Sequence, residues 1–167
     1  LTSGRVGLFL GCAAAVCASD LVTKWWVFRS LQEGLRYAVI PPVLYLSPSC
    51  NTGGVFGVGK GQVAWFAVLS LIAAAFIVWV FLRHGAEDRW LSVALSMLLG
   101  GAAGNLYDRI VFRQVRDFLD VGAGPYRWPT FNVADAAICV GVGMILLSSL
   151  LAKEPEAPDK APERKPS

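Results

Sequence analysis

The sequence predicts an all-α membrane protein with four transmembrane helices and a small β-containing loop region on one side of the membrane. The chain has 167 residues, of which 55% are hydrophobic. Its mean hydropathy of +0.53 is too high for an ordinary soluble domain of this length. It also contains three long runs without a charged residue, and about 20 apolar residues are enough to span a bilayer.

The first predicted span, residues 5–28, contains the shortest apolar run. Val6–Ser19 has only 14 residues, so the span reaches sufficient length only if the helix continues past Lys24. A cleaved secretory signal peptide is the competing interpretation, because Arg5 precedes the run and small residues occur near its end. We favour a membrane helix, since no mature soluble domain follows.

The three charge-free runs predict the other spans. They contain 22, 18 and 17 residues and are Gly61–Leu82, Trp90–Tyr107 and Ala136–Ala152. We place the corresponding spans at residues 61–82, 90–107 and 131–152. Two long connections, residues 29–60 and 108–130, then lie on the side of the membrane opposite the termini.

Residues 1–152 form a single four-helix domain in this interpretation. In its first connection, the short apolar stretches Tyr37–Ile40 and Val43–Leu46 flank two prolines and predict short strands. The tail, residues 153–167, alternates charges with prolines and is predicted to be disordered. Lys and Arg do not orient the domain, because seven of the 15 lie on the terminal side and the other eight lie on the loop side, at the end of the first span or in the connections.

The composition disfavours several classes of binding site. The stretch from Gly54 to Lys60 imitates a phosphate-binding loop, but Gly61 stands where Ser or Thr must hold magnesium. The four cysteines show no metal-ligand spacing, and the chain has only one histidine. We therefore expect no cofactor and no metal. The net charge of +3 is too small and too evenly spread to indicate nucleic acid.

Small and aromatic residues in the spans have structural explanations. Gly100 and Gly104 have the small-x-x-x-small spacing that lets two membrane helices approach closely. The aromatic residues expected to anchor the span ends at the membrane interface are Trp25, Trp26, Trp90, Tyr107, Tyr126 and Trp128.

Five carboxylates fall on the loop side of the predicted bundle: Asp20, Asp108, Asp117, Asp120 and Asp135. Asp20 could form an ion pair with Lys24 one turn later. Asp108 could pair with Arg109, and Asp120 could be an ordinary solvated residue. Asp117 is harder to explain in this way, because it lies between apolar neighbours in VRDFLDV, 18 residues before Asp135.

Asp135 lies one turn inside the last predicted helix and allows two interpretations. It could serve in the cap of that helix, with Asn132 as the N-cap residue. Alternatively it is functional, since an ionised side chain at bilayer depth costs about 2.5 to 3.5 kcal/mol and usually faces a bundle interior or a watery cavity.

Asp117 and Asp135 could meet, because the turn-rich segment GAGPYRWPT returns the chain to the membrane between them. Two carboxylates that share one water cannot both ionise easily and titrate as a coupled pair. The ionised member then takes a proton from water while the protonated member stabilises the oxyanion, as peptide hydrolysis requires. We expect Asp135 to be the more acidic member, because a helix N-terminus favours its anion.

Five motifs, taken in order, resemble the bacterial lipoprotein signal peptidase family, signal peptidase II. They are DLVTK (residues 20–24), NTGGVFG (51–57), GGAAGNLYDR (100–109), VRDFLD (115–120) and FNVADAA (131–137). The resemblance extends from about Leu10 to Leu150. It implies an aspartyl intramembrane protease with catalytic Asp117 and Asp135, which removes the signal peptide of prolipoproteins immediately before a diacylglyceryl-modified cysteine.

The resemblance also implies a location, partners and supporting residues. It implies a multi-pass protein of the bacterial cytoplasmic (inner) membrane, with cytoplasmic termini and with its loops and active site on the periplasmic or extracytoplasmic side. Prolipoproteins and membrane lipids are the expected partners, and we expect a monomer. The family's supporting positions match Asp20, Lys24, Asn51, Asn105, Asp108, Arg109 and Asn132. Gly53 and Arg116 complete the predicted set of substrate-binding or dyad-supporting residues.

Two residues depart from the family pattern. Arg116 stands where the family usually has an apolar residue, and Val55 replaces a small residue. Arg116 could lower the pKa of Asp117 if its guanidinium folds back, or it could point toward lipid headgroups or substrate.

Two other functions compete with the protease interpretation. A small proton-coupled membrane carrier would place ionisable groups near the bilayer midplane, whereas the middles of these spans are free of charge. A non-enzymatic scaffold would use Gly100 and Gly104 for association and would need no carboxylate pair.

Overall fold

The structure is a computed structural model that describes residues 3–54, 59–85 and 88–151. Within these ranges, four helices are long and apolar enough to cross a membrane, and a small antiparallel sheet accompanies them, which confirms the predicted fold class. The helices are α1 (Ser3–Ser30), α2 (Val63–Val80), α3 (Arg89–Val111) and α4 (Val133–Leu151). Residue 55 and the tail, for which the sequence made predictions, lie outside the described residues.

The helix bounds differ from the predicted spans at particular residues. α1 continues past Lys24 to Ser30, because Lys24 is buried against neighbouring helices and not exposed to lipid. α2 runs into a single π-helical turn, η2 (Phe81–Gly85). α3 begins after Asp88, whose Oδ1 accepts the Trp90 backbone N–H at 2.7 Å as an N-cap, and it extends to Val111.

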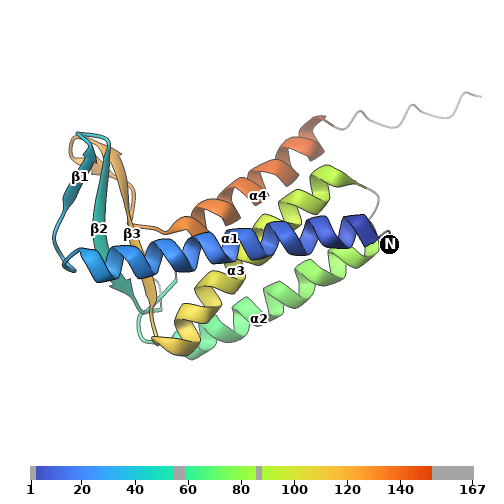
Figure 1. The fold of residues 1–167 in the computed structure, drawn as a ribbon, viewed down its shortest axis with the longest axis horizontal. Coiled ribbons are helices and arrows are strands. Elements are labelled where there is room, and N and C mark those ends of the chain that lie inside the picture. Colours follow the sequence, from blue (N-terminus) through green and yellow to red (C-terminus); the bar gives the residue numbers. More distant parts are fainter. Residues whose placement is uncertain (1–2, 55–58, 86–87, 152–167) are drawn as a thin grey trace, which may run out of the picture.

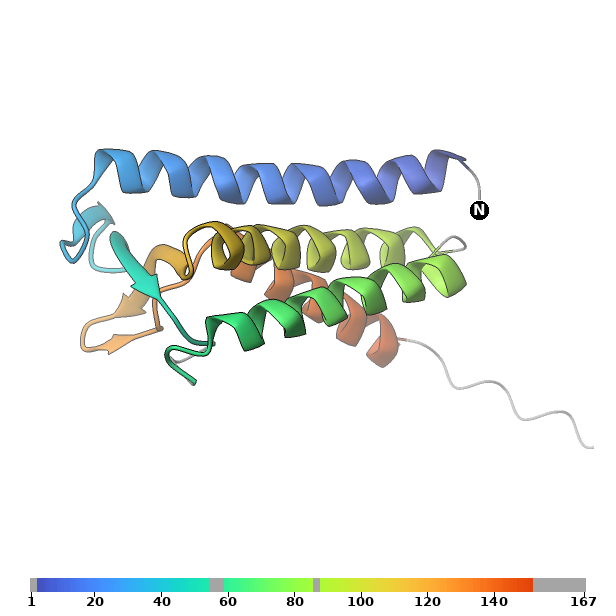
Figure 2. The same cartoon turned by 90° about the horizontal axis from the view of Figure 1, so that it is seen from below.

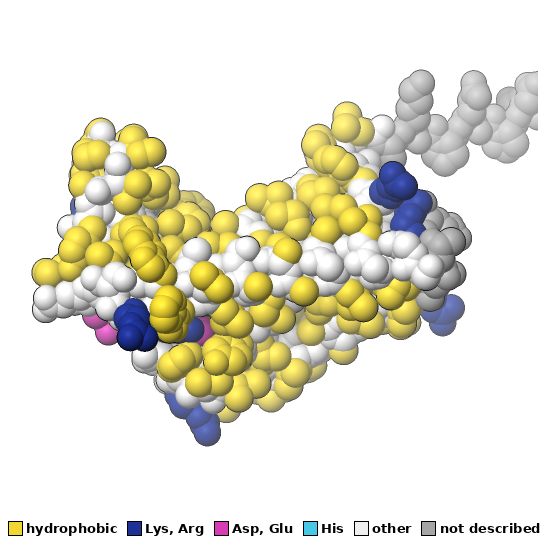
Figure 3. Space-filling view, viewed as in Figure 1, with side chains coloured by type: hydrophobic (Ala, Val, Ile, Leu, Met, Phe, Trp, Pro, Cys, Tyr) yellow, Lys and Arg dark blue, Asp and Glu magenta, His cyan; other side chains and the backbone are white. Residues whose placement is uncertain are grey.

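α3 is the central helix of the bundle. It packs against α1, α2 and α4, and Figures 1 and 2 show it between the other three. At the end of the bundle away from the sheet, Phe9 stacks on Phe81 with ring centroids 3.8 Å apart, next to Ile77 and Leu95. On the face shown in Figure 3 the helices are largely apolar, while Lys and Arg gather toward the two ends, as expected for a bundle surrounded by lipid.

Glycines let the other helices approach α3 closely. A Cβ on Gly100 would lie 2.5 Å from the Ala13 carbonyl oxygen of α1. One on Gly101 would lie 2.5 Å from the carbonyl oxygen of Ala134 in α4. A Cβ on Gly104 would collide with the Asp20 carboxylate. The predicted small-residue contact therefore exists, within one chain and between α3 and α1.

A four-stranded antiparallel sheet lies over one end of the bundle (Figure 1). Its strands, in spatial order, are β1 (Tyr37–Ile40), β2 (Leu44–Asn51), β3 (Val115–Ala123) and β4 (Tyr126–Arg127). β1 matches the predicted strand, whereas β2 extends beyond its predicted stretch. β3, which carries Asp117, follows α3 after a turn in which Arg113 has a φ of 58°, the left-handed conformation common after helix C-termini.

The close approach of α1 and α3 predicts a specific cost for adding one methyl group. Gly100→Ala would push a Cβ against backbone of α1 and should destabilise the protein by about 1 to 3 kcal/mol. Gly143→Ala is the matched control, because a Cβ there meets nothing within 4 Å and alanine favours the helix by about 1 kcal/mol. Thermal unfolding in detergent should show a lower Tm only for Gly100→Ala. Equal Tm values for both variants would contradict the packing.

Candidate active site

Asp135 and Asn132 cap the N-terminus of α4 reciprocally. The Asp135 backbone N–H donates to Asn132 Oδ1 at 2.9 Å, and the Asn132 backbone N–H donates to Asp135 Oδ2 at 3.2 Å. The second carboxylate oxygen, Oδ1, accepts a hydrogen bond from Asn105 Nδ2 of α3 at 2.8 Å. Asp135 therefore acts in the helix cap and also joins a network between helices, so the two interpretations from the sequence are compatible.

Asp117 lies on the inward face of β3 and is only 3% exposed. Its Oδ1 accepts a hydrogen bond from Asn132 Nδ2 at 2.7 Å, and its Oδ2 accepts one from Asn51 Nδ2 at 3.4 Å. Asn51 is held in turn by the Gly53 backbone N–H, which donates to its Oδ1 at 2.9 Å. Asn132 thus contacts both Asp117 and Asp135, and the two carboxylates belong to one hydrogen-bonded unit.

The surroundings of Asp117 favour its protonated form. Burial, followed by the negative charge of Asp135, raises the pKa of Asp117 from its ordinary value to about 7, against the opposing effects of the two asparagine amides and of Lys24. Asp135, by contrast, accepts hydrogen bonds from a backbone N–H and an amide and is partly exposed. A proton held by this pair is therefore expected on Asp117.

Lys24 organises the polar residues behind the pair. Its fully buried ammonium lies 2.7 Å from Asp20 Oδ2 and 3.3 Å from Asp108 Oδ2, and it donates to Asn105 Oδ1 at 3.0 Å. Because Asn105 Oδ1 also accepts from Asn132 Nδ2 at 3.1 Å, the Asn105 amide can only direct its NH2 group at Asp135.

Asp20 connects this cluster to α4. Its Oδ1 accepts the backbone N–H of Ala134 at 2.9 Å, inside the first turn of the helix that carries Asp135. The backbone N–H groups of a first helical turn have no partner within the helix, so a carboxylate there satisfies one of them. Asp20 thereby fixes the start of α4 against α1.

Neither arginine pairs with the aspartate that the sequence offered as its partner, which was Asp117 for Arg116 and Asp108 for Arg109. Arg116 binds Asp108 through its Nε, its Nη2 and its backbone N–H, with contacts of 2.7 to 3.3 Å. It does not fold back onto Asp117. Asp108 therefore pairs with Lys24 and Arg116, while Arg109 points toward α2, where its Nη1 donates to Ser70 Oγ at 3.4 Å. From there Arg109 interacts electrostatically with both Asp117 and Asp135.

The structure brings the predicted site residues together, whereas Asp120, the remaining acid among the five loop-side carboxylates, lies apart. Asp120 is 7% exposed and pairs with Arg127 of β4 and with Arg36, the residue before β1, so it is not the solvated residue considered from the sequence. Ser70, the α2 partner of Arg109, was not predicted, because nothing in the sequence pattern distinguishes it as a site residue. Within the described ranges, no three His, Cys, Asp or Glu side chains form a group suited to a metal ion.

Comparisons with known proteins point to one family. Residues 12–151 match the family model described as Signal peptidase (SPase) II. The chain is 39% identical to the lipoprotein signal peptidase of Bacillus pumilus (strain SAFR-032) over 132 residues, which cover 79% of this chain and 85% of that one. Two solved structures described as bacterial membrane enzymes are each 30% identical. Their TM-scores are 0.83 and 0.81, and they cover 91% and 89% of this chain and 95% and 96% of their own.

The raised pKa of Asp117 predicts how stability depends on pH. The unfolded chain releases this proton near the ordinary value of 3.8, whereas the folded protein holds it to about 7. The unfolded state therefore binds fewer protons between these values, and stability falls as pH rises, by at most about 1.4 kcal/mol per pH unit. Unfolding in detergent from pH 4 to 8 should show this loss, and Asp117→Asn should flatten it. An unchanged slope in Asp117→Asn would refute the shift.

Proposed function

The chain belongs to the signal peptidase II family of proteases, and we propose that Asp117 and Asp135 form its catalytic pair, sharing one proton and activating one water. The observation that carries this proposal is the hydrogen bonding of both carboxylates to Asn132, which places acids from β3 and α4 in one unit. Their unequal surroundings support different roles for the two acids.

In the proposed reaction, ionised Asp135 takes a proton from water as the water oxygen attacks the scissile carbonyl carbon. Protonated Asp117 donates its proton to the carbonyl oxygen, so a neutral tetrahedral intermediate forms. Asp117, now ionised, takes a proton back from one hydroxyl as the C–N bond breaks, and Asp135 gives its proton to the leaving nitrogen. The products are a carboxylic acid and an amine, and the pair returns to its starting protonation.

The supporting residues hold this pair without touching the reacting water in the proposed mechanism. Asn105 donates to Asp135 and is oriented by Lys24, while Asn51 and Asn132 donate to Asp117. Arg109 supplies a positive charge from the α2 side that favours the anionic state of the pair. Because these contacts exist before substrate binds, little reorganisation is needed during the reaction.

The proposed substrate is a prolipoprotein cut immediately before a diacylglyceryl-modified cysteine. Acyl chains and an apolar signal helix both remain in lipid, so the scissile bond is held near the membrane interface. Asp135 lies in the first turn of α4 and Asp117 in the sheet over the same end of the bundle, which matches that depth. We place this end on the extracytoplasmic side of the bacterial inner membrane and propose that the enzyme acts as a monomer.

Amide substitutions test the catalytic pair directly. Asp117→Asn and Asp135→Asn should each reduce cleavage of a diacylated prolipoprotein by purified protein by at least about 10³-fold, because either change removes a proton-transfer step. Asp120→Asn is the matched control, since that acid pairs with Arg36 and Arg127 and not with the network around Asp117 and Asp135, and it should keep most of the activity. A non-acylated precursor should not be cut by any of them. Cleavage retained by both pair variants, once circular dichroism shows that they fold, would exclude the mechanism.

A further inference from the structure

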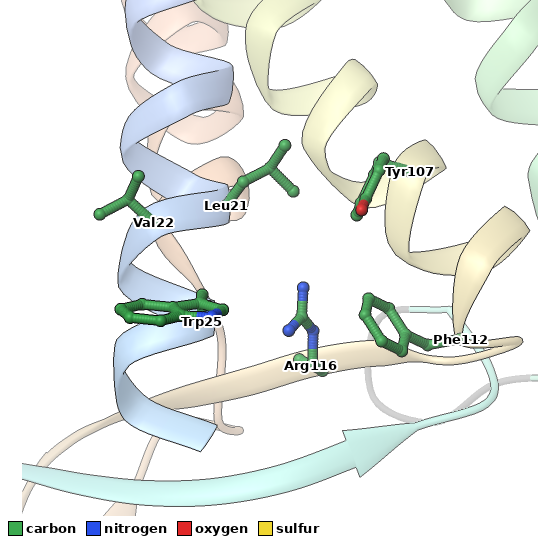
Figure 4. A pocket seen from close by; sticks show the side chains of 6 residues that line it. All are labelled: Leu21, Val22, Trp25, Tyr107, Phe112 and Arg116. Atoms are coloured by element: carbon green, nitrogen blue, oxygen red, sulfur yellow. The ribbon is translucent and has the colours of Figure 1, made fainter. Parts of the chain in front are cut away.

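A groove of about 270 Å³ opens between α1 and α3 at the end of the bundle nearest the sheet. It is lined by Leu21, Val22, Trp25, Tyr107, Phe112 and Arg116 (Figure 4). Arg116 precedes Asp117 in β3, and successive side chains of a strand point to opposite faces. The groove therefore lies on the other side of β3 from the proposed catalytic pair.

Arg116 is fixed at the base of this groove, and part of its guanidinium makes no hydrogen bond. Nε and Nη2 bind Asp108, and the guanidinium carbon lies 4.1 Å from the ring centroid of Phe112. Nη1 has no hydrogen-bond partner among the described residues, so its two N–H groups remain available. Figure 4 shows the guanidinium projecting into the groove between Trp25 and Phe112.

Two further donors border the same space. The Trp25 indole and the Tyr107 hydroxyl have no hydrogen-bond partner within the described part of the chain, and both rings line the groove in Figure 4. A second cation stands at its edge, because the Arg29 guanidinium lies 5.3 Å from the Trp25 ring centroid. Donors from α1, α3 and β3 thus converge on one site.

We propose that this groove binds one membrane phospholipid, with its phosphodiester between Arg116, Trp25 and Tyr107 and its acyl chains along Leu21 and Val22. The charges support an anion here. Asp20, Lys24, Asp108 and Arg116 sum to zero, so the exposed Arg29 adds a net positive charge beside the groove. Guanidinium groups are favoured partners of phosphate oxygens, and the indole N–H is a further hydrogen-bond donor.

The walls of the groove favour a lipid over a free anion. Val22 is 62% exposed and Tyr107 is 44% exposed on the outer faces of predicted membrane helices. Aromatic residues at span ends lie at the depth of the headgroups. A phospholipid would satisfy the donors and cover this apolar surface together, whereas inorganic phosphate would satisfy only the donors.

Native mass spectrometry of the full chain in detergent tests the proposal. Phosphatidylglycerol, a diacylglycerol with the same acyl chains and inorganic phosphate are titrated separately. Phosphatidylglycerol should be retained at least about tenfold more tightly than diacylglycerol, and inorganic phosphate should not compete at millimolar concentration. Equal retention of the two lipids, or displacement by inorganic phosphate, would overturn the assignment.

A pair of matched variants locates the lipid. Trp25→Phe combined with Tyr107→Phe removes two donors while keeping both rings, and it should lower phosphatidylglycerol retention by about tenfold. Trp26→Phe combined with Tyr126→Phe makes the same chemical changes at exposed residues outside the groove and should retain the lipid as the parent does. Arg116→Leu should bind most weakly if it folds. Equal retention by the two double variants would overturn the proposal.

Discussion

The site depends on one fully buried ammonium group. Lys24 lies inside the bundle with no exposed surface, and its charge must be balanced by groups fixed around it. Asp20 supplies one carboxylate from the same helix, and Asp108 supplies another from α3. Removing one partner of such a buried pair leaves an uncompensated charge and costs about 3 to 5 kcal/mol. The need to satisfy Lys24 therefore fixes α1 relative to α3.

The same constraint extends to the two carboxylates of the proposed catalytic pair. Lys24 occupies the oxygen of Asn105 and thereby turns its NH2 group toward Asp135. Asp20 holds the first turn of α4 through the Ala134 backbone N–H. The absence of side chains at Gly100 and Gly104 allows α1 to lie close enough for both contacts. Helix packing, the balance of the buried charges and the orientation of the site residues therefore depend on one another.

The helices and the cap of α4 could be predicted because each depends on residues that are close together in the sequence. Charge-free runs predicted the helices, because a polypeptide in lipid must satisfy its backbone hydrogen bonds within each segment. The link between Asp117 and Asp135 was predicted from the turn-rich segment that returns the chain to the membrane and from the resemblance of five motifs to one family. Asn132 and Asp135 predicted a helix cap from their spacing alone, and the structure contains that cap.

The features that sequence could not predict depend on tertiary geometry. Asp108 and Arg109 are adjacent in the chain, but adjacent side chains on a helix point apart, and Asp108 instead binds Arg116 after the chain reverses direction. The role of Arg116 therefore depends on a turn at Arg113 and on which face of β3 it occupies. Asp120 likewise lies next to Arg36 and Arg127 only because strand pairing brings these residues together.

We propose that one proton resides on Asp117 while Asp135 is ionised. Infrared difference spectroscopy of the protein in detergent, with isotope-labelled aspartate, measures protonated carboxyl groups directly. At pH 6 we expect a carboxylic acid band that titrates near the Asp117 pKa of about 7, disappears in Asp117→Asn and remains in Asp135→Asn at a lower titration point. A band that persists in Asp117→Asn and disappears in Asp135→Asn would contradict the account.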